Sequence, residues 1–123
     1  MDPSITFVDC RTYVRFDFRG RFALQPLLEL MREIRTCCIE HGHRRVLVDV
    51  RESQGALGTF DRYEHAREMA KPGNLGVRTA IVARPDQILP DRFWETVTRN
   101  RGHMTCVVTE LNDGLAWLAT AEP

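Results

Sequence analysis

At 123 residues the chain is long enough to bury the core of one domain and too short for two, so residues 1–123 are expected to form a single domain. Seventeen basic and seventeen acidic residues leave no net charge, whereas a dedicated nucleic-acid-binding protein usually carries a basic excess. No segment approaches the roughly twenty apolar residues of a membrane span, and MDPSITFVDC at the amino terminus lacks the features of a secretory signal. A cytoplasmic protein without a membrane span or a nucleic-acid partner is therefore predicted.

The first third of the chain predicts two strands and a helix. Residues 5–10 and 12–18 are strand-like, and the second segment alternates apolar with charged side chains until Gly20, which is expected to end it. So short a connection predicts an antiparallel pair at the sheet edge. A helix from about Pro26 then carries an apolar stripe that stops at Gly42, a natural carboxyl-terminal cap. The sequence leaves open whether the edge strand pairs with a second copy, giving a homodimer, or is shielded.

The remaining two thirds alternate strands with helices. The expected elements are a strand at 46–50, a helix at 59–71, a strand at 77–83, a helix that opens at Pro90, a strand at 104–109 and a short helix capped by Asn112. The order β-β-α-β-α-β-α-β-α predicts an α/β fold with four helices and a mixed sheet of about five strands. Right-handed crossovers with a monotonic strand order would place all helices on one side, although the sequence leaves one or two covered faces open.

The segment RRVLVDVRESQGALGTFD at 44–61 joins a buried strand to an amphipathic helix. Such turns at the carboxyl edge of an α/β sheet usually carry the binding chemistry. Gly55 and Gly58 permit backbone angles that other residues resist, and Thr59 is expected to cap the helix. The helix is expected to carry its apolar side chains on one face, at Phe60, Tyr63, Ala66 and Ala70.

Several segments together carry a family resemblance. They are VLVDV at 46–50, TFDRYEHAREMA at 59–70, RTAIVA at 78–83, FWETVTRNRG at 93–102 and DGLAWL at 113–118. In their order and spacing the chain resembles the STAS superfamily along nearly its whole length, and it is similar to the stand-alone SpoIIAA-like branch of anti-sigma-factor antagonists. The resemblance implies a non-catalytic fold that contacts other proteins or, in some relatives, senses a ligand. A kinase or an anti-sigma-type protein is the partner that it implies.

The resemblance also implies a modification site. In the classical antagonists a Ser or Thr in an Asp-Ser-Ser/Thr-Gly loop, at the start of the second helix, is phosphorylated by a partner kinase. This chain has Glu52-Ser53-Gln54-Gly55 there, so Ser53 is the nearest match and Thr59 is the competing hydroxyl. A phosphate beside a helix amino terminus meets free amides while adding bulk and charge to a docking surface. The alternative interpretation makes Thr59 a helix cap and Ser53 a solvated loop residue.

Two functional hypotheses follow. The first is a regulatory module that docks a partner protein through residues 53–67. The residues expected to contact the partner are the glycines of the loop and the exposed positions of the helix, namely Gly55, Gly58, Asp61, Arg62, Glu64, His65 and Arg67. The alternative is a sensor that holds a small apolar ligand or a lipid between the sheet and the helices, although the same apolar residues would fill an ordinary core.

The sequence contains no recognisable metal, cofactor or catalytic motif. His41 and His43 flank a glycine near two cysteines, but histidines at this spacing do not share a helix face, so a solvated pair at the helix end is predicted. The segment around Ser53 is no nucleophile elbow, since Arg51 stands where the first glycine of the elbow belongs. The four cysteines lack CxxC spacing and are interpreted as buried thiols in a reducing compartment. No enzyme activity, metal or cofactor is therefore predicted.

Two further clusters have both a functional and a structural interpretation. Arg84 with Arg99 and Arg101 would form a basic patch for an anion, or the two later arginines complement the dipole of their helix. The adjacent Phe93 and Trp94 cannot both face the core, so one of them is a candidate contact residue.

Overall fold

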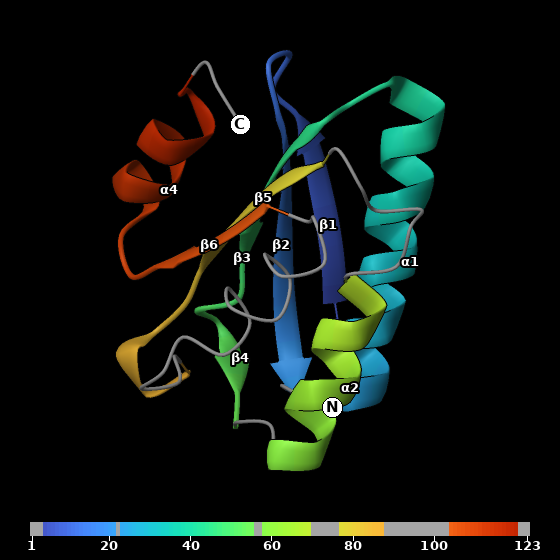
Figure 1. Cartoon of the computed structure of the whole chain (residues 1–123), viewed down its shortest axis with the longest axis vertical. Coiled ribbons are helices and arrows are strands. Elements are labelled where there is room, and N and C mark those ends of the chain that lie inside the picture. The colour runs from blue at the N-terminus through green and yellow to red at the C-terminus, as the bar shows by residue number, and fades with distance from the viewer. Residues whose placement is uncertain (1–3, 22, 56–57, 70–76, 88–103, 121–123) are drawn as a thin grey trace.

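The computed structural model describes residues 4–21, 23–55, 58–69, 77–87 and 104–120 (Figure 1). The elements in chain order are β1 (Ser4–Asp9), β2 (Val14–Arg21), α1 (Leu24–His41), β3 (Arg45–Asp49), β4 (Ser53–Gln54), α2 (Thr59–Met69), β5 (Arg78–Val82), the 3-10 turn η2 (Pro85–Gln87), β6 (Met104–Val108) and α4 (Leu111–Leu118). These residues contain three α-helices where the sequence predicts four. The helix expected to open at Pro90, with Phe93 and Trp94, lies outside the described residues.

The described strands form one mixed sheet in the order β1-β2-β3-β5-β6, with β4 also paired to β2. β1 and β2 are antiparallel, with Phe7 opposite Phe16, and every other pair is parallel. The predicted antiparallel start and parallel continuation are confirmed. The central strands β3 and β5 are buried almost throughout, which explains why they appear in the sequence as apolar runs without alternation.

The strand that follows β2 in the sheet contains an irregularity. Asp17 pairs with Asp49 and Gly20 pairs with Ser53, so β3 and β4 together carry one residue more than β2 over this stretch. The extra residue is accommodated by a turn at Arg51 and Glu52, in which the Ser53 N–H donates to the Val50 carbonyl at 3.1 Å, so the ladder with β2 is interrupted here. The prediction that Gly20 ends the second strand is wrong, because its φ of 118° lets β2 continue to Arg21.

The two faces of the sheet are covered by different helices (Figure 1). α1 contributes Leu27 and Leu30 to a core with Phe16 and Phe18, and α2 packs against α1. α4 packs on β3, β5 and β6 from the other face, where Leu118 meets Leu47. The expectation of helices on one side holds for α1 and α2, which lie within crossovers, but not for α4, which follows the last strand.

The helix ends agree only partly with the prediction. α1 ends at His41, and Gly42 has a left-handed φ of 72° while its N–H donates to the Cys38 carbonyl at 2.8 Å, as expected of a carboxyl-terminal cap. α4 begins at Leu111, so Glu110 occupies the capping position and the predicted cap Asn112 lies inside the helix.

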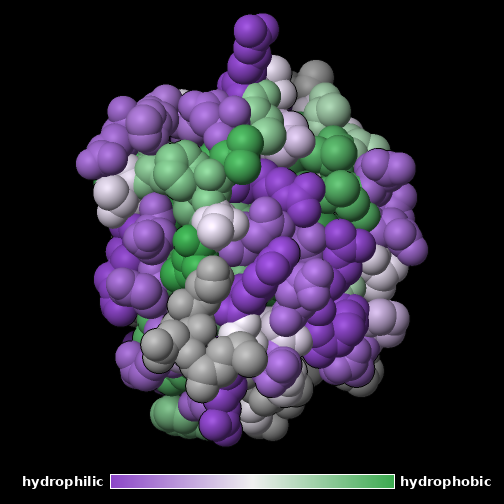
Figure 2. Space-filling view, turned by 180° about the vertical axis from the view of Figure 1, so that it is seen from behind, coloured by the Kyte–Doolittle hydropathy of each residue, from purple (hydrophilic) through white to green (hydrophobic). Residues whose placement is uncertain are grey.

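Some large apolar side chains remain outside the core of the described residues. They are Phe7, Val8, Ile39, Phe60 and Tyr63. Two of them belong to the outer strand β1 and two belong to α2. Seen from behind, apolar side chains form separate areas between hydrophilic ones and make no continuous patch (Figure 2).

The close approach of α4 to the sheet predicts a specific sensitivity at Gly114. A Cβ atom at this position would lie 3.3 Å from the Leu47 side chain and 3.4 Å from that of Val108. We expect Gly114→Val to lower the free energy of unfolding by about 1–3 kcal/mol, because a larger side chain overpacks this contact. Ala116→Val, at an exposed position of the same helix, is the matched control in urea denaturation, and an equal loss in both variants would contradict the packing argument.

Candidate functional site

The candidate site lies where β3 ends and α2 begins. Ser53, predicted as a solvated loop residue or a modification site, is only 2% exposed. Its hydroxyl donates to the Val50 carbonyl at 2.5 Å and accepts from the Gln87 side-chain amide at 2.8 Å. The solvated-loop interpretation is wrong because Ser53 belongs to β4, which pairs with β2 and is covered by Gln87.

Two residues that follow β5 hold this loop. The Arg84 guanidinium donates through Nη1 to the carbonyls of Arg51 and Ser53, at 2.5 and 2.6 Å. The Gln87 side-chain amide donates to the Val50 carbonyl at 3.2 Å, while its oxygen accepts from the Arg84 backbone N–H at 2.8 Å. Arg84 therefore faces backbone carbonyls and Asp86, with which it forms an ion pair at 3.1 Å. The other arginines of its predicted anion patch lie outside the described residues.

The start of α2 differs in detail from the prediction. Thr59 is the first residue of the helix, so Gly58 and not Thr59 precedes it. Gly58 is exposed, and Gly55 is exposed with a φ of 85°, a conformation that glycine adopts far more readily than other residues. The chain therefore turns out of the sheet at Gly55, as the sequence suggested.

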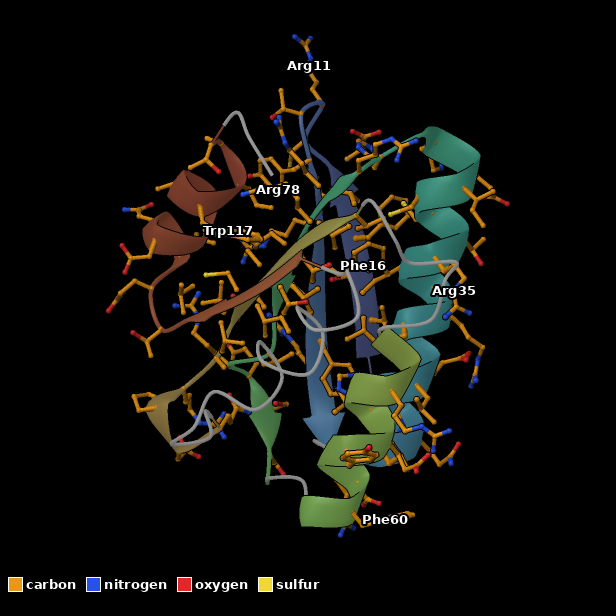
Figure 3. All side chains as sticks on the ribbon, viewed as in Figure 1. Arg11, Phe16, Arg35, Phe60, Arg78 and Trp117 are labelled. Carbon is orange, nitrogen blue, oxygen red and sulfur yellow. The ribbon has the colours of Figure 1, made fainter. Side chains whose placement is uncertain are left out.

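The predicted faces of α2 are wrong. Phe60 and Tyr63, expected on the apolar inner face, are 73% and 44% exposed, whereas His65, expected to be exposed, is buried with only 6% of its surface accessible. α2 packs against α1, and the side that it buries carries His65. Figure 3 shows Phe60 near the outer end of α2, pointing away from the sheet.

The charged residues of α2 are less exposed than predicted. Arg67 is exposed and forms an ion pair with the half-buried Glu64 at 3.0 Å, one helical turn away. Asp61 is half-buried, and the side chain of Arg62 lies outside the described residues. The exposed surface of α2 thus combines two aromatic rings with a salt-bridged charged pair.

A buried charge stands at the end of β3. The Asp49 carboxylate accepts from Arg51 at 2.8 Å and from Arg15 at 3.2 Å, and Arg15 also pairs with Asp17 at 3.0 Å. Burial by itself raises the pKa of Asp49, but the hydrogen bonds from the Arg51 side chain and backbone, with the charges of Arg51 and Arg15, outweigh it and lower the pKa below its usual value. Asp49 is therefore ionised and links β2 to the start of the loop.

The histidines and cysteines near the end of α1 lie in different environments. His41 is exposed, but His43 is not solvated as predicted, because only 9% of its side chain is accessible and Nε2 lies 3.2 Å from an Asp9 carboxylate oxygen. Burial raises the pKa of the Cys38 thiol to about 11, which keeps it protonated and unreactive at neutral pH. Among the residues that the structure describes, no three His, Cys, Asp or Glu side chains are grouped to hold a metal ion.

None of the helices in the described part of the chain is long and apolar enough to cross a membrane.

Comparison with known proteins gives matches only at the level of structure. No family model and no curated protein matches the sequence. An uncharacterized protein with a SpoIIAA-like fold from Shewanella loihica superposes with a TM-score of 0.53 and 17% identity, over 95% of this chain and 93% of that one. An anti-sigma factor antagonist from Mycobacterium paratuberculosis superposes with a TM-score of 0.63 and 13% identity, over 97% and 96% of the two chains. The chain therefore has a SpoIIAA-like fold, as its resemblance implied.

The buried carboxylate of Asp49 predicts a pH-dependent effect. Because its pKa is lower in the folded than in the unfolded chain, its stabilisation is complete above the unfolded value and is lost as pH falls through the folded value. We expect Asp49→Asn to lower the free energy of unfolding by about 1–3 kcal/mol at pH 7. This difference should shrink as pH falls below about 4. Denaturation series at several pH values test this, with the exposed Glu33→Gln as control, and a pH-independent difference would contradict it.

The buried hydroxyl of Ser53 predicts a measurable role in stability. Ser53→Ala removes the acceptor of one Gln87 amide hydrogen and one donor to the Val50 carbonyl. We expect a loss of about 1 kcal/mol in the free energy of unfolding, measured by urea denaturation beside Thr12→Ala, which alters an exposed hairpin hydroxyl. A loss no greater than that of the control would show that the hydroxyl is as dispensable as a solvated one.

Proposed function

We propose that this chain is a non-catalytic regulatory module that binds another protein through the loop and helix at residues 53–67. The docking surface consists of Gly55, Gly58, Phe60, Tyr63, Glu64 and Arg67. The observation that carries the proposal is the exposure of Phe60 and Tyr63, at 73% and 44%, on a helix that directly follows the glycine loop. Two aromatic rings three positions apart share one side of a helix.

The composition of this surface is typical of an interface. Aromatic side chains dominate the binding energy of protein contacts, because they bury a large apolar area at a small cost in conformational entropy. The Glu64–Arg67 ion pair lies on the same helix and would form part of a polar rim. The buried His65 is not part of the docking surface, in contrast to the sequence-based hypothesis.

The fold supports a regulatory role in general terms. One structural neighbour is an anti-sigma factor antagonist, and a module of this type has a regulatory protein as its partner. A kinase or an anti-sigma-type protein in the cytoplasm is the partner class that we propose. Because a shared fold alone does not establish a shared function, the proposal depends on the surface of α2 and not on the neighbour.

Modification of a hydroxyl in this region is part of the proposal. A phosphate at Thr59, the first residue of α2, would meet the free amides of the helix start and add negative charge beside Phe60. Ser53 requires an additional step, because its hydroxyl is buried and hydrogen-bonded. The loop would have to open locally before a kinase could reach it.

Other predictions remain untested. Homodimer formation through β1 stays a prediction, with Phe7 and Val8 exposed on that strand at 48% and 56%. A ligand-sensing role receives no specific support from the described residues, since Leu27 and Leu30 of α1 pack directly into the core with the strands.

Site-specific crosslinking tests the docking surface. A photoreactive phenylalanine analogue at position 60 is expected to crosslink a partner in extracts of the source cells. The same analogue at Ile39, which is 75% exposed on α1, provides the matched control. A product formed equally from both positions, or from neither, would contradict docking through α2.

With the crosslinked partner purified, single substitutions give the energetic test. We expect Phe60→Ala to weaken binding at least tenfold, because a central aromatic residue of an interface typically contributes about 2 kcal/mol or more. Its thermal melt should remain unchanged, since the ring is 73% exposed in the free chain. Ile39→Ala should bind like the native chain in the same calorimetric titration. Unimpaired binding by Phe60→Ala would exclude α2 as the docking element.

A further inference from the structure

We infer that Arg84 and Gln87 form a latch that holds residues 50–55 and positions the docking surface from outside it. This inference rests on the proposed function, because it concerns how the same surface is regulated. Neither residue belongs to the docking surface, and both follow β5, more than thirty positions along the chain from the carbonyls that they hold. The latch therefore connects the end of β5 to the loop that leads into α2.

The latch acts where the pairing of β3 and β4 with β2 is interrupted. The extra residue between Asp49 and Ser53 interrupts the regular pairing of this strand with β2. Arg84 supplies donors to the carbonyls on both sides of Glu52, and Gln87 adds a donor to the Val50 carbonyl, which also accepts from the Ser53 N–H and hydroxyl. Buried backbone carbonyls require such partners, and donors from a charged guanidinium make stronger hydrogen bonds than neutral ones.

Neighbouring groups of the same turn orient both latch side chains. The Gln87 side-chain oxygen accepts from the Arg84 backbone N–H at 2.8 Å, which fixes the amide so that its nitrogen faces Val50 and Ser53. Asp86 accepts from Arg84 Nε at 3.1 Å and so orients the guanidinium. Because Gln87 is held by the backbone of Arg84 and the guanidinium is held by Asp86, each side chain holds the loop through its own contacts.

A modification of Ser53 would act directly on the latch. Its hydroxyl oxygen accepts from the Gln87 amide, so any group attached to that oxygen displaces Gln87. Release of Gln87 frees the backbone just before Gly55, where the chain turns toward α2. A modified Ser53 would thus alter the docking surface by opening the latch, in addition to any direct repulsion of the partner.

Hydrogen exchange of the full chain, read by mass spectrometry, tests the latch without a partner. We expect Arg84→Gln and Gln87→Leu each to raise exchange of the amides at 50–55 at least tenfold, while β5 and α1 keep native protection. Arg84→Lys, which retains the charge but not the fork of donors, should give an intermediate rate. Arg32→Gln removes an exposed arginine that pairs with Glu29 on α1 and serves as the matched control.

Each outcome decides the inference. Native exchange at 50–55 in the Arg84 and Gln87 variants overturns it, and so does an equal increase across the whole chain, which would indicate general destabilisation. Phe60→Ala is expected to leave exchange at 50–55 unchanged. If position 60 fails to crosslink a partner while the Arg84 and Gln87 variants open the loop, the proposed function fails and the latch stands. If position 60 crosslinks a partner while exchange at 50–55 stays native in the Arg84 and Gln87 variants, the docking proposal stands and the latch is refuted.

Discussion

The peptide unit of Arg51 is held from both sides, and the candidate site depends on this constraint. Its N–H donates to the Asp49 carboxylate at 3.0 Å, and its carbonyl accepts from Arg84 at 2.5 Å. Two side chains thus fix the backbone where the sheet pairing is interrupted. They are the buried Asp49 at the end of β3 and Arg84, which follows β5. This backbone leads directly into Ser53 and the turn at Gly55.

The sequence predicted most strands and helices of the described residues because short local patterns of residues determine them. The run at 46–50 lacks alternation since β3 is covered on both faces, and Gly42 ends α1 through a left-handed cap that few other residues accept. The antiparallel start and the parallel continuation of the sheet followed from the short first connection and the later helical crossovers. The side of the sheet taken by α4 did not follow, because no later strand constrains a terminal helix.

The side-chain environment of the site could not be predicted, since it depends on contacts between distant residues. Arg84 and Ser53 are 31 positions apart, and no local pattern marks a side chain that hydrogen-bonds to carbonyls. On α2 the aromatic residues suggested a buried face, but the helix packs against α1 through the side that carries His65. Large exposed aromatic side chains are an exception to the usual pattern of burial. Such exceptions are expected at functional surfaces, where residues are selected for binding and not for packing in the core.

Docking and latching use different residues, so a change in the latch can alter binding while every contact residue stays the same. The docking surface would gain its energy from apolar area at Phe60 and Tyr63, whereas the latch holds backbone carbonyls through buried and partly buried hydrogen bonds. If a partner binds only the latched loop, its apparent dissociation constant is the intrinsic value divided by the latched fraction. A change that leaves about one tenth of the molecules latched therefore weakens binding about tenfold without touching a contact residue. Such a change at Ser53 would regulate docking from inside the fold, which distinguishes it from a charge placed on the surface.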